Sequence, residues 1–246
     1  MGIVVAVVSG KGGTGKTSVC AGVSVALASA GLRVLCIDCD VGLRNLDISL
    51  GMTDSGTLSF LDISEGSYEL SQAPKHPQFP GLAFLTAPMN RPIEQIDQEA
   101  FGELLRKARG LYDYILLDAP AGVDAGFRLV SAAADRFLLV TGPGPAAIRD
   151  AARVGELLEL QGKNDVRLVV NRVNKNMLTL LRLTIDDVMD RAGLPLIGVV
   201  LEDADVPLAA ACGLPLVRYS RRSYAAIAYQ KIAKRIQGLP EPITLR

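Results

Sequence analysis

The chain has 246 residues, of which 49% are apolar, and 26 basic residues balance 26 acidic ones. A chain of this length can bury one substantial core, so we expect residues 1–246 to form a single domain. The balanced charge argues against nucleic acid as a partner, because such binding normally requires a basic excess. No apolar run approaches the roughly 18 residues that span a bilayer, and the N-terminus lacks the charged start of a signal peptide. These features favour a cytoplasmic protein.

Short apolar runs rich in β-branched residues recur along the chain, and amphipathic segments separate many of them. Such runs do not alternate with polar residues, which is typical of strands that are buried on both faces. The predicted strands are Ile3–Val8 and residues 34–37, 82–85, 114–117, 137–140, 166–170 and 197–201, and the predicted helices include residues 18–30, 98–109, 148–160 and 223–237. The sequence therefore predicts an α/β fold: a doubly wound, mostly parallel β-sheet with helices on both faces.

The first predicted strand is followed by a glycine-rich turn, Gly10 to Thr17, that leads into the first predicted helix. The spacing of Gly10, Gly15, Lys16 and Thr17 matches a P-loop, in which backbone N–H groups surround an anion. The helix that follows directs its positive end at the same anion. Lys16 would contact the outer phosphates, and the Thr17 hydroxyl would reach Mg²⁺. The sequence thus predicts a site for a nucleoside triphosphate with Mg²⁺.

Acidic residues follow two of the predicted strands, Asp38 and Asp40 after the second and Asp118 after the fourth. In doubly wound sheets, ligands bind at the carboxyl ends of the strands. A single acid at a strand end is usually a turn or N-cap residue. Three of them in company with a P-loop instead indicate the surroundings of a nucleotide-bound Mg²⁺, which binds few carboxylates and keeps several waters.

Lys11 adds a second lysine to the loop, where closing the turn does not require one. The segment Lys11-Gly12-Gly13-Thr14-Gly15-Lys16-Thr17 resembles the deviant Walker A motif of the MinD/ParA ATPases, which are P-loop NTPases of the SIMIBI type. In that family the first lysine reaches the ATP of the partner in a nucleotide-sandwich dimer. The resemblance therefore implies an ATP-dependent homodimer with Lys11 as a catalytic and dimerisation residue.

Residues 38–47 and 118–122 are similar to switch I and switch II of the MinD-type septum site-determining ATPases, and the similarity continues to about residue 215. The resemblance implies roles for three groups of residues. The catalytic residues would be Lys11, Lys16, Asp40 and Asn45; the nucleotide contacts Gly10, Lys11, Gly12, Gly13, Thr14, Gly15, Lys16, Thr17, Ser18, Gly122, Asn171 and Arg172; and the Mg²⁺ neighbours Thr17, Asp38 and Asp118. It implies a slow, Mg²⁺-dependent ATP hydrolase activated by dimerisation, acting in septum placement.

The same resemblance implies a docking face for a division-regulator protein on the helix after the fifth predicted strand, near Arg149 and Asp150. Relatives usually carry a second acid where this chain has Ala152, and a solvated helix face is the alternative for these two residues. The membrane-binding amphipathic tail of the family is replaced by a segment that contains Pro240 and Pro242. Basic residues between 218 and 235 offer another route to an anionic surface, so peripheral contact with the inner face of the membrane stays open.

Three alternatives use the same loop. One is a related positioning ATPase for plasmids, chromosomes or flagella, and another is an iron–sulfur cluster carrier, although residues 118–145 contain no cysteine. The third is a metabolic kinase or ligase. Cys36 and Cys39 form a C-x-x-C pair that we interpret as small buried side chains, and His76 is expected on a surface loop within the irregular stretch 66–81.

Overall fold

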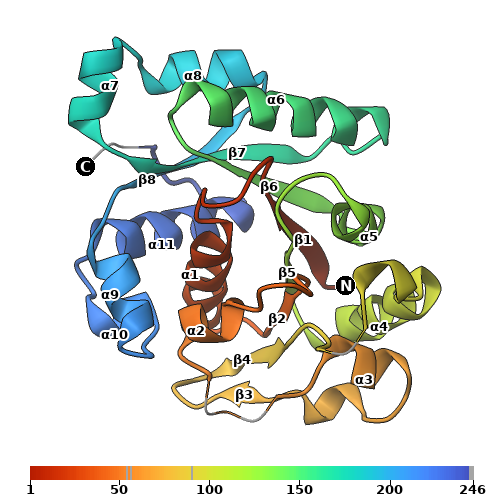
Figure 1. Ribbon diagram of the computed structural model, residues 1–246. Helices are drawn as coiled ribbons and strands as arrows, with labels where there is room; N and C mark the ends of the chain where they lie inside the picture. Colours follow the sequence, from red (N-terminus) through yellow and green to blue (C-terminus); the bar gives the residue numbers. More distant parts are fainter. Residues whose placement is uncertain (54, 56, 90, 244–246) are drawn as a thin grey trace.

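One sheet of eight strands organises the computed structural model, which describes residues 1–53, 55, 57–89 and 91–243 of the chain (Figure 1). The strands lie in the order β3-β4-β2-β5-β1-β6-β7-β8, and every neighbouring pair is parallel except β3 and β4. Their bounds are β1 (Ile3–Val8), β2 (Val34–Asp38), β3 (Lys75–His76), β4 (Phe79–Leu85), β5 (Tyr114–Asp118), β6 (Arg136–Thr141), β7 (Val166–Val173) and β8 (Leu196–Leu201). The order reverses at β1, which places the loop after β1 at the switch point where such sheets bind ligands.

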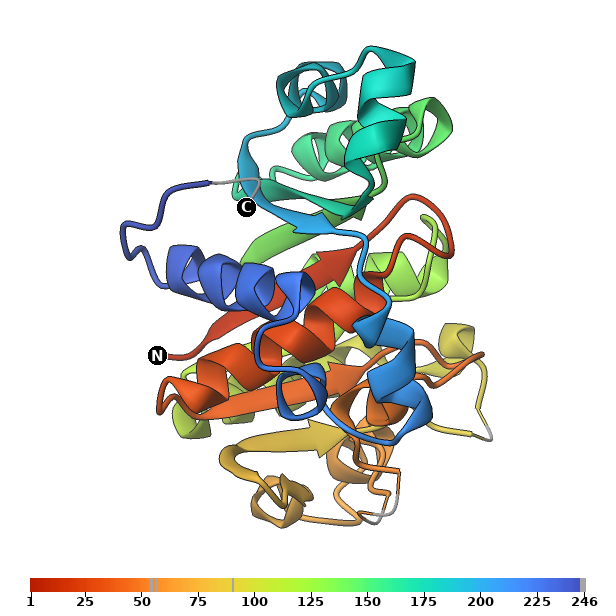
Figure 2. The ribbon, with the colours of Figure 1, turned by 90° about the vertical axis from the view of Figure 1, so that its left-hand side faces the viewer.

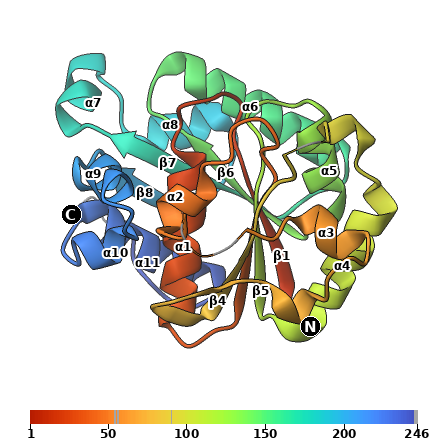
Figure 3. The same cartoon turned by 60° about the horizontal axis from the view of Figure 1, so that its bottom comes forward.

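Helices cover both faces of this sheet (Figure 3). One face carries α1 (Lys16–Ser29), α2 (Leu46–Leu50), α9 (Asp205–Ala211), α10 (Leu216–Tyr219) and α11 (Tyr224–Ile236). The other carries α3 (Phe60–Ser64), α4 (Gln98–Leu111), α5 (Ala125–Ala133), α6 (Pro145–Leu160), α7 (Lys175–Leu181) and α8 (Ile185–Ala192). Two short 3₁₀ turns, η1 (Leu70–Gln72) and η2 (Ile93–Gln95), complete the described elements.

Successive residues of the central strand belong to different cores. Val4, Ala6 and Val8 pack with the helices of one face, and Val5 and Val7 pack with α1 and α11 on the other. All five are at most 1% exposed. Because side chains alternate across a strand, only a sheet covered on both sides makes such a strand apolar throughout. The predicted α/β architecture is therefore confirmed.

All seven predicted strands are present, and most are longer at their ends than the apolar runs alone indicated. β2 and β5 continue through Asp38 and Asp118, because the sheet's hydrogen bonds pair these two polar residues with each other. The first helix ends with Ala30 as C-cap, followed by Gly31 at φ 88°, the left-handed conformation that glycine adopts at low cost. Cys36 and Cys39 are both free and fully buried, as predicted.

The prediction for His76 was wrong. This residue lies in β3 and is only 2% exposed, and its Nε2 is 2.8 Å from the carbonyl oxygen of Leu50. The Gln78 amide donates to His76 Nδ1 at 3.0 Å, so Nε2 carries the proton and donates. The stretch expected to be irregular thus contains η1, β3 and the start of β4. The prolines around His76 favoured the prediction of a loop, but β3 is a two-residue edge strand that pairs in the antiparallel sense with β4, just beyond a tight turn.

The predicted C-terminal helix is α11, and it packs on the sheet. Ser223 is its N-cap and accepts a hydrogen bond from the Ala226 amide. A Cβ placed on Gly198 of β8 would lie 2.4 Å from Ile232, which shows how closely helix and strand approach. The described part of the proline-containing tail, through residue 243, is not helical, and residues 244–246 of that predicted segment lie outside the described residues.

Candidate nucleotide-binding site

The loop between β1 and α1 has the backbone geometry of an anion cradle. Gly13 and Gly15 take positive φ angles of 78° and 83°, and Gly15 is the N-cap of α1 with no side-chain cap. The first N–H groups of α1 therefore remain available to a ligand, at the positive end of the helix dipole. A Cβ on Gly12 or Gly13 would meet nothing within 4 Å, so this side of the loop faces open space.

Two residues of β7 hold the loop from the other side. Asn171 Nδ2 donates to the Thr14 carbonyl at 2.8 Å, and Arg172 Nη1 donates to the Gly13 carbonyl at 3.1 Å. Arg172 adopts φ 56°, which is uncommon for a residue other than glycine. A Cβ on Gly15 would lie 2.2 Å from Asn171 Nδ2, so only glycine fits at this position. Asn171 and Arg172 therefore support the loop itself, in addition to the nucleotide contacts predicted for them.

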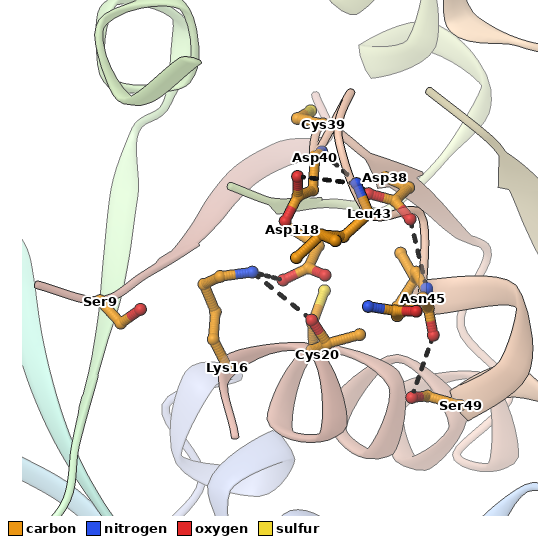
Figure 4. Close-up of polar contacts among 12 residues, drawn as sticks. Ser9, Lys16, Cys20, Asp38, Cys39, Asp40, Leu43, Asn45, Ser49 and Asp118 are labelled. Carbon is orange, nitrogen blue, oxygen red and sulfur yellow. Dashed lines mark hydrogen bonds and ion pairs between the residues drawn. The ribbon is translucent and has the colours of Figure 1, made fainter. Parts of the chain in front are cut away.

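Lys16 and Asp118 form a buried ion pair at the base of the loop (Figure 4). Lys16 Nζ lies 2.6 Å from Asp118 Oδ1 and 3.5 Å from Thr17 Oγ1. Burial alone would lower the pKa of Lys16, but the charge and hydrogen bond of Asp118 outweigh it and raise the pKa, so the ammonium stays charged. Burial raises the pKa of Asp118, with Lys16 opposing that effect. The structure thus unites the predicted phosphate lysine with the predicted Mg²⁺ neighbours Thr17 and Asp118.

Asp38 closes the predicted switch I segment at both of its ends. Its Oδ1 accepts the Asp40 amide at 2.9 Å and its Oδ2 accepts the Leu46 amide at 3.2 Å. The side chain is buried, and burial together with the nearby Asp118 charge raises the pKa of Asp38 to about 7. The buried carboxyls of Asp38 and Asp118 both have raised pKa values. A cation bound near them would be stabilised, because its positive charge favours the ionised forms of both groups.

Asp40 and Asn45 lie on the loop that Asp38 closes. Asp40 Oδ1 accepts the amides of Gly42 and Leu43 at 3.2 and 3.3 Å, a local turn that leaves its second oxygen without a hydrogen bond among the described residues. Asn45 is exposed, and its carbonyl accepts the Ser49 hydroxyl at 3.3 Å. Figure 4 places both residues on the same side of the site as Asp38 and Asp118. Their catalytic roles remain predictions.

The residues present fit a nucleotide with Mg²⁺. Thr14 Oγ1 is the buried side-chain polar atom without a hydrogen-bond partner among the described residues, and it lies within the loop that would surround the phosphates. No group of three or more His, Cys, Asp and Glu residues is arranged to hold a metal in the described part of the chain. A nucleotide-bound Mg²⁺ needs only one or two carboxylates, so Asp38, Asp118 and the Thr17 hydroxyl would suffice.

Lys11 and Gly122 flank the mouth of the loop. Lys11 is exposed and forms no ion pair with any described residue. Gly122, predicted to sense the γ-phosphate, has φ 91° and donates its amide to the Ser9 carbonyl at 3.1 Å. A contact between this amide and a phosphate would therefore require the Ser9 bond to break, so the two partners exclude one another.

A cleft of about 500 Å³ extends from Gly15 and Ser18 past Asn171 to the end of β8. Its volume suits the nucleoside part of a nucleotide. The far wall is formed by residues 200–204 together with Val206, Pro207 and Ala210, which were missed in the sequence. The rule that ligands gather at the carboxyl ends of strands would have found Glu202 and Asp203, since both follow the predicted strand 197–201.

The predicted docking helix touches the loop. Arg149 is exposed on α6, whereas Asp150 is half-buried. A Cβ on Gly10 would lie 2.6 Å from Asp150 Cβ and 2.8 Å from the Asp150 carbonyl oxygen, so the backbones of loop and helix are in close contact. A shift of the loop at Gly10 would therefore press against α6 at Asp150.

Residues 5–216 match the family model described as the CobQ/CobB/MinD/ParA nucleotide binding domain. The chain belongs to this family. The septum site-determining protein MinD of Synechocystis sp. is 36% identical over 244 residues, covering 98% of this chain and 92% of that protein. The family assignment confirms the resemblance seen in the loop and agrees with the fold predicted from the apolar runs.

Solved structures of family members agree with the fold. The MinC:MinD cell division protein complex of Aquifex aeolicus contains a chain that superposes with a TM-score of 0.90 at 33% identity, covering 98% of both chains. MinD of Pyrococcus horikoshii complexed with Mg-ADP gives a TM-score of 0.83 at 30% identity, with 96% of each chain covered. Among the described residues, no helix is both long enough and apolar enough to cross a membrane.

Proposed function

We propose that the chain is a MinD-type ATPase that acts as a nucleotide-controlled dimeric switch in placing the division septum. The observation that carries the proposal is the loop itself: Lys16 is buried against Asp118, while a second lysine, Lys11, is exposed at the mouth with no ionic partner among the described residues. One cation is therefore positioned for the phosphates of its own subunit. The other is free to serve the nucleotide of a second copy.

Hydrolysis of ATP needs a positioned water and neutralised charge more than covalent chemistry. Mg²⁺, when bound with ATP, would supply charge neutralisation at the phosphates. The Lys16 ammonium would exchange Asp118 for phosphate oxygens, and Asp118, Asp38 and Thr17 would then be free to orient the ion's water shell. Asp40, which keeps one oxygen available, would position or activate the attacking water, and Asn45 would help to order it.

The nucleotide would be held along the loop and the adjoining cleft. Backbone amides from Gly10 to Ser18 would bind the phosphates, and the base and ribose would fill the cleft beside Asn171 and Arg172. The Gly122 amide would leave the Ser9 carbonyl for the γ-phosphate, which couples ATP to the position of residues 118–122. Loss of the γ-phosphate would restore the Ser9 bond. The switch thus has two alternative hydrogen bonds for one donor.

A regulator of division would dock on α6 near Arg149 and Asp150. The relative of known structure in Aquifex aeolicus is a complex of MinC with MinD, which supports a partner of this kind. The packing of Asp150 against Gly10 would link that surface to the nucleotide. We further propose that residues 1–246 act as one ATPase domain and that the protein works in the cytoplasm, with peripheral contact at the inner face of the membrane as an additional possibility.

The test is the mass of the protein in solution with ATP, with ADP and without nucleotide, measured together with ATP hydrolysis. We expect a dimer with ATP and monomers in the other two states. Lys11→Ala should bind ATP yet remain monomeric and hydrolyse slowly, whereas Lys16→Ala should lose nucleotide binding. Lys107→Ala is the matched lysine control, because Lys107 is exposed on α4, away from the loop. A Lys11→Ala protein that dimerises normally with ATP would overturn the trans role.

Sedimentation with anionic liposomes in the same nucleotide states tests the membrane part separately. ATP-dependent sedimentation would support peripheral contact. If the protein forms dimers with ATP that do not sediment with the liposomes, the membrane contact is contradicted and the ATP switch still stands.

A further inference from the structure

A second cleft lies at the end of the sheet opposite the P-loop. It encloses about 450 Å³ between the amino-terminal ends of the central strands and the last turn of α11. Figure 2 shows the start of β1 and the end of α11 on one side of the molecule, and the loop between β1 and α1 on the other. The volume lies in the range of small-molecule sites, and none of its lining residues belongs to the candidate nucleotide site.

Positive charge predominates in this cleft. Its charged lining residues are Arg136, Arg167, Arg235 and Asp165, which leaves two positive charges in excess. Asp165 is shared: its Oδ2 lies 3.1 Å from Arg136 Nε, and its Oδ1 lies 3.0 Å from Arg167 Nε. The Arg167 contact is a hydrogen bond and the Arg136 contact is an ion pair only, so neither arginine forms the two parallel hydrogen bonds of a fork-like carboxylate pair with Asp165.

Several hydrogen-bond donors in the cleft have no protein partner among the described residues. Arg136 donates through Nη1 to the Ile236 carbonyl at 3.0 Å, but its Nη2 and both terminal nitrogens of Arg167 form no hydrogen bond with any described residue. The Tyr114 hydroxyl, which belongs to a side chain only 8% exposed, likewise has no partner among them. Burial raises the pKa of Tyr114, so this hydroxyl remains a donor at neutral pH.

Arg235 contributes charge without offering donors. Its guanidinium binds the carbonyls of Ile197, Glu241 and Pro242 at 2.6–2.9 Å. The Glu241 carboxylate binds Lys234 at 2.9 Å, so that pair neutralises itself. These carbonyls fix the charge of Arg235 in the wall of the cleft, and the Glu241 carboxylate also lies near it. Val5, Leu138 and Ile197 add apolar surface between the charged groups.

We propose that this cleft binds a small organic phosphate. The phosphate would lie against the free guanidinium nitrogens of Arg136 and Arg167 and accept the Tyr114 hydroxyl, while the organic part would cover the apolar surface. Arginine matches phosphate because its planar donors can bind two oxygens at once. The same chemistry is offered by a free phosphate ester and by the phosphate headgroup of an anionic lipid.

The test uses phenyl phosphate as the free ester, with ADP and Mg²⁺ at saturating concentration to occupy the P-loop. Binding is followed by calorimetry in the wild type, Arg167→Gln and Asp165→Asn. Arg167→Gln should weaken binding about tenfold, the loss expected for one charge-assisted hydrogen bond. Asp165→Asn should tighten it, because the competing carboxylate disappears. Arg222→Gln removes an exposed charge outside the cleft and should change nothing.

The two variants are expected to change the affinity in opposite directions, and a folding defect cannot produce that result. A damaged cleft would weaken binding in both variants, so tighter binding by Asp165→Asn can only reflect the removed charge. Sedimentation with phosphatidylglycerol vesicles, and with phosphatidylcholine vesicles as the neutral control, distinguishes the sources. If Arg167→Gln weakens and Asp165→Asn tightens the binding of phenyl phosphate, the free ester is supported as the ligand. If the two variants show these opposite changes with phosphatidylglycerol vesicles alone, the lipid headgroup is supported. The proposal is overturned if neither ligand shows them.

Discussion

The Lys16 ammonium lies 2.6 Å from the Asp118 carboxylate, and both side chains are almost fully buried, at 7% and 1% exposure. The pair joins the loop after β1 to the end of the neighbouring strand β5. In the absence of a ligand, each charge stabilises the other in a place where an unpaired charge would be costly. A phosphate approaching Lys16 must therefore compete with Asp118, and the acid released is the one suited to a metal ion.

Removing one partner of this pair should destabilise the protein without nucleotide. Asp118→Asn leaves the Lys16 charge buried and uncompensated, so we expect the free energy of unfolding to fall by about 3 kcal/mol. Urea denaturation without nucleotide measures this. Glu156→Gln is the control, because it breaks an exposed pair with Arg153 on α6 and should have little effect. Equal losses in the two variants would contradict the importance of burial.

Substitution of Gly15 should damage the loop more than substitution of Gly12. Gly15→Ala introduces a Cβ 2.2 Å from Asn171 Nδ2 at φ 83°, so the loop or the asparagine must move. We expect a loss of about 2 kcal/mol in unfolding free energy, since a left-handed conformation alone costs a residue with a side chain about 1 kcal/mol or more. Gly12→Ala, whose Cβ would meet nothing within 4 Å, should unfold like the wild type. Thermal denaturation without nucleotide compares the two.

His76 should make stability depend on pH. Burial disfavours the charged ring and lowers the pKa of His76, and the hydrogen bond to the Leu50 carbonyl opposes this effect only in part. The unfolded chain therefore binds more protons just below the ordinary pKa of about 6.5, and stability falls as the pH drops through that region. The decrease levels off below the folded pKa. Denaturation measured between pH 8 and 5 should show that the unfolding free energy of His76→Gln depends less on pH than that of the wild type. An equal dependence on pH in the two proteins would assign the effect to other groups.

Asp38 should control the order of the loop between residues 39 and 46. Asp38→Ala removes the acceptor of both the Asp40 and the Leu46 amides, so hydrogen exchange at Leu46 should become faster. Asp47→Ala is the control, because Asp47 Oδ1 accepts only the amide of the next residue, Ile48, at 2.8 Å. Exchange measured by mass spectrometry over residues 39–50 would reveal the difference. Similar protection in both variants would assign the loop's order to other contacts.

The close packing of α11 on the sheet should leave no room for an added methyl group at Gly198. Gly198→Ala places a Cβ 2.4 Å from Ile232, and we expect a loss of about 2 kcal/mol from overpacking. Ile232→Ala on its own should cost about 3 kcal/mol, because it removes most of a buried side chain, including the Cγ1 and Cδ1 atoms that the added Cβ would meet. The double variant should be more stable than the sum of the single losses predicts, since the smaller side chain accommodates the added methyl group. If the stability losses of the single variants simply add in the double variant, the side chains at the two positions do not compete for the same volume.

Much of the fold could be predicted from the sequence. The seven main strands, the P-loop and the three acids at the strand ends are local signals: an apolar run, a glycine spacing and a carboxylate directly after a strand. Lys11, Lys16 and Asp118 were found in this way, and the structure brings the last two together. The sequence was less informative where a residue's neighbour is distant or its own segment is short. His76 was misplaced because its burial depends on Leu50, 26 residues away.

By itself, the sequence determined which groups can bind phosphate and which strands carry them, because glycine spacing and apolar periodicity act within a few residues. Only the tertiary structure decided that Asn171 braces the loop from 157 residues away, that Gly122 is held by Ser9, and that arginines of β6, β7 and α11 share one cleft. These relationships arise from the crossover connections, which place strands remote in sequence side by side, so that their carboxyl ends meet at one end of the sheet and their amino ends at the other. Chain order and local composition carry no direct record of that proximity.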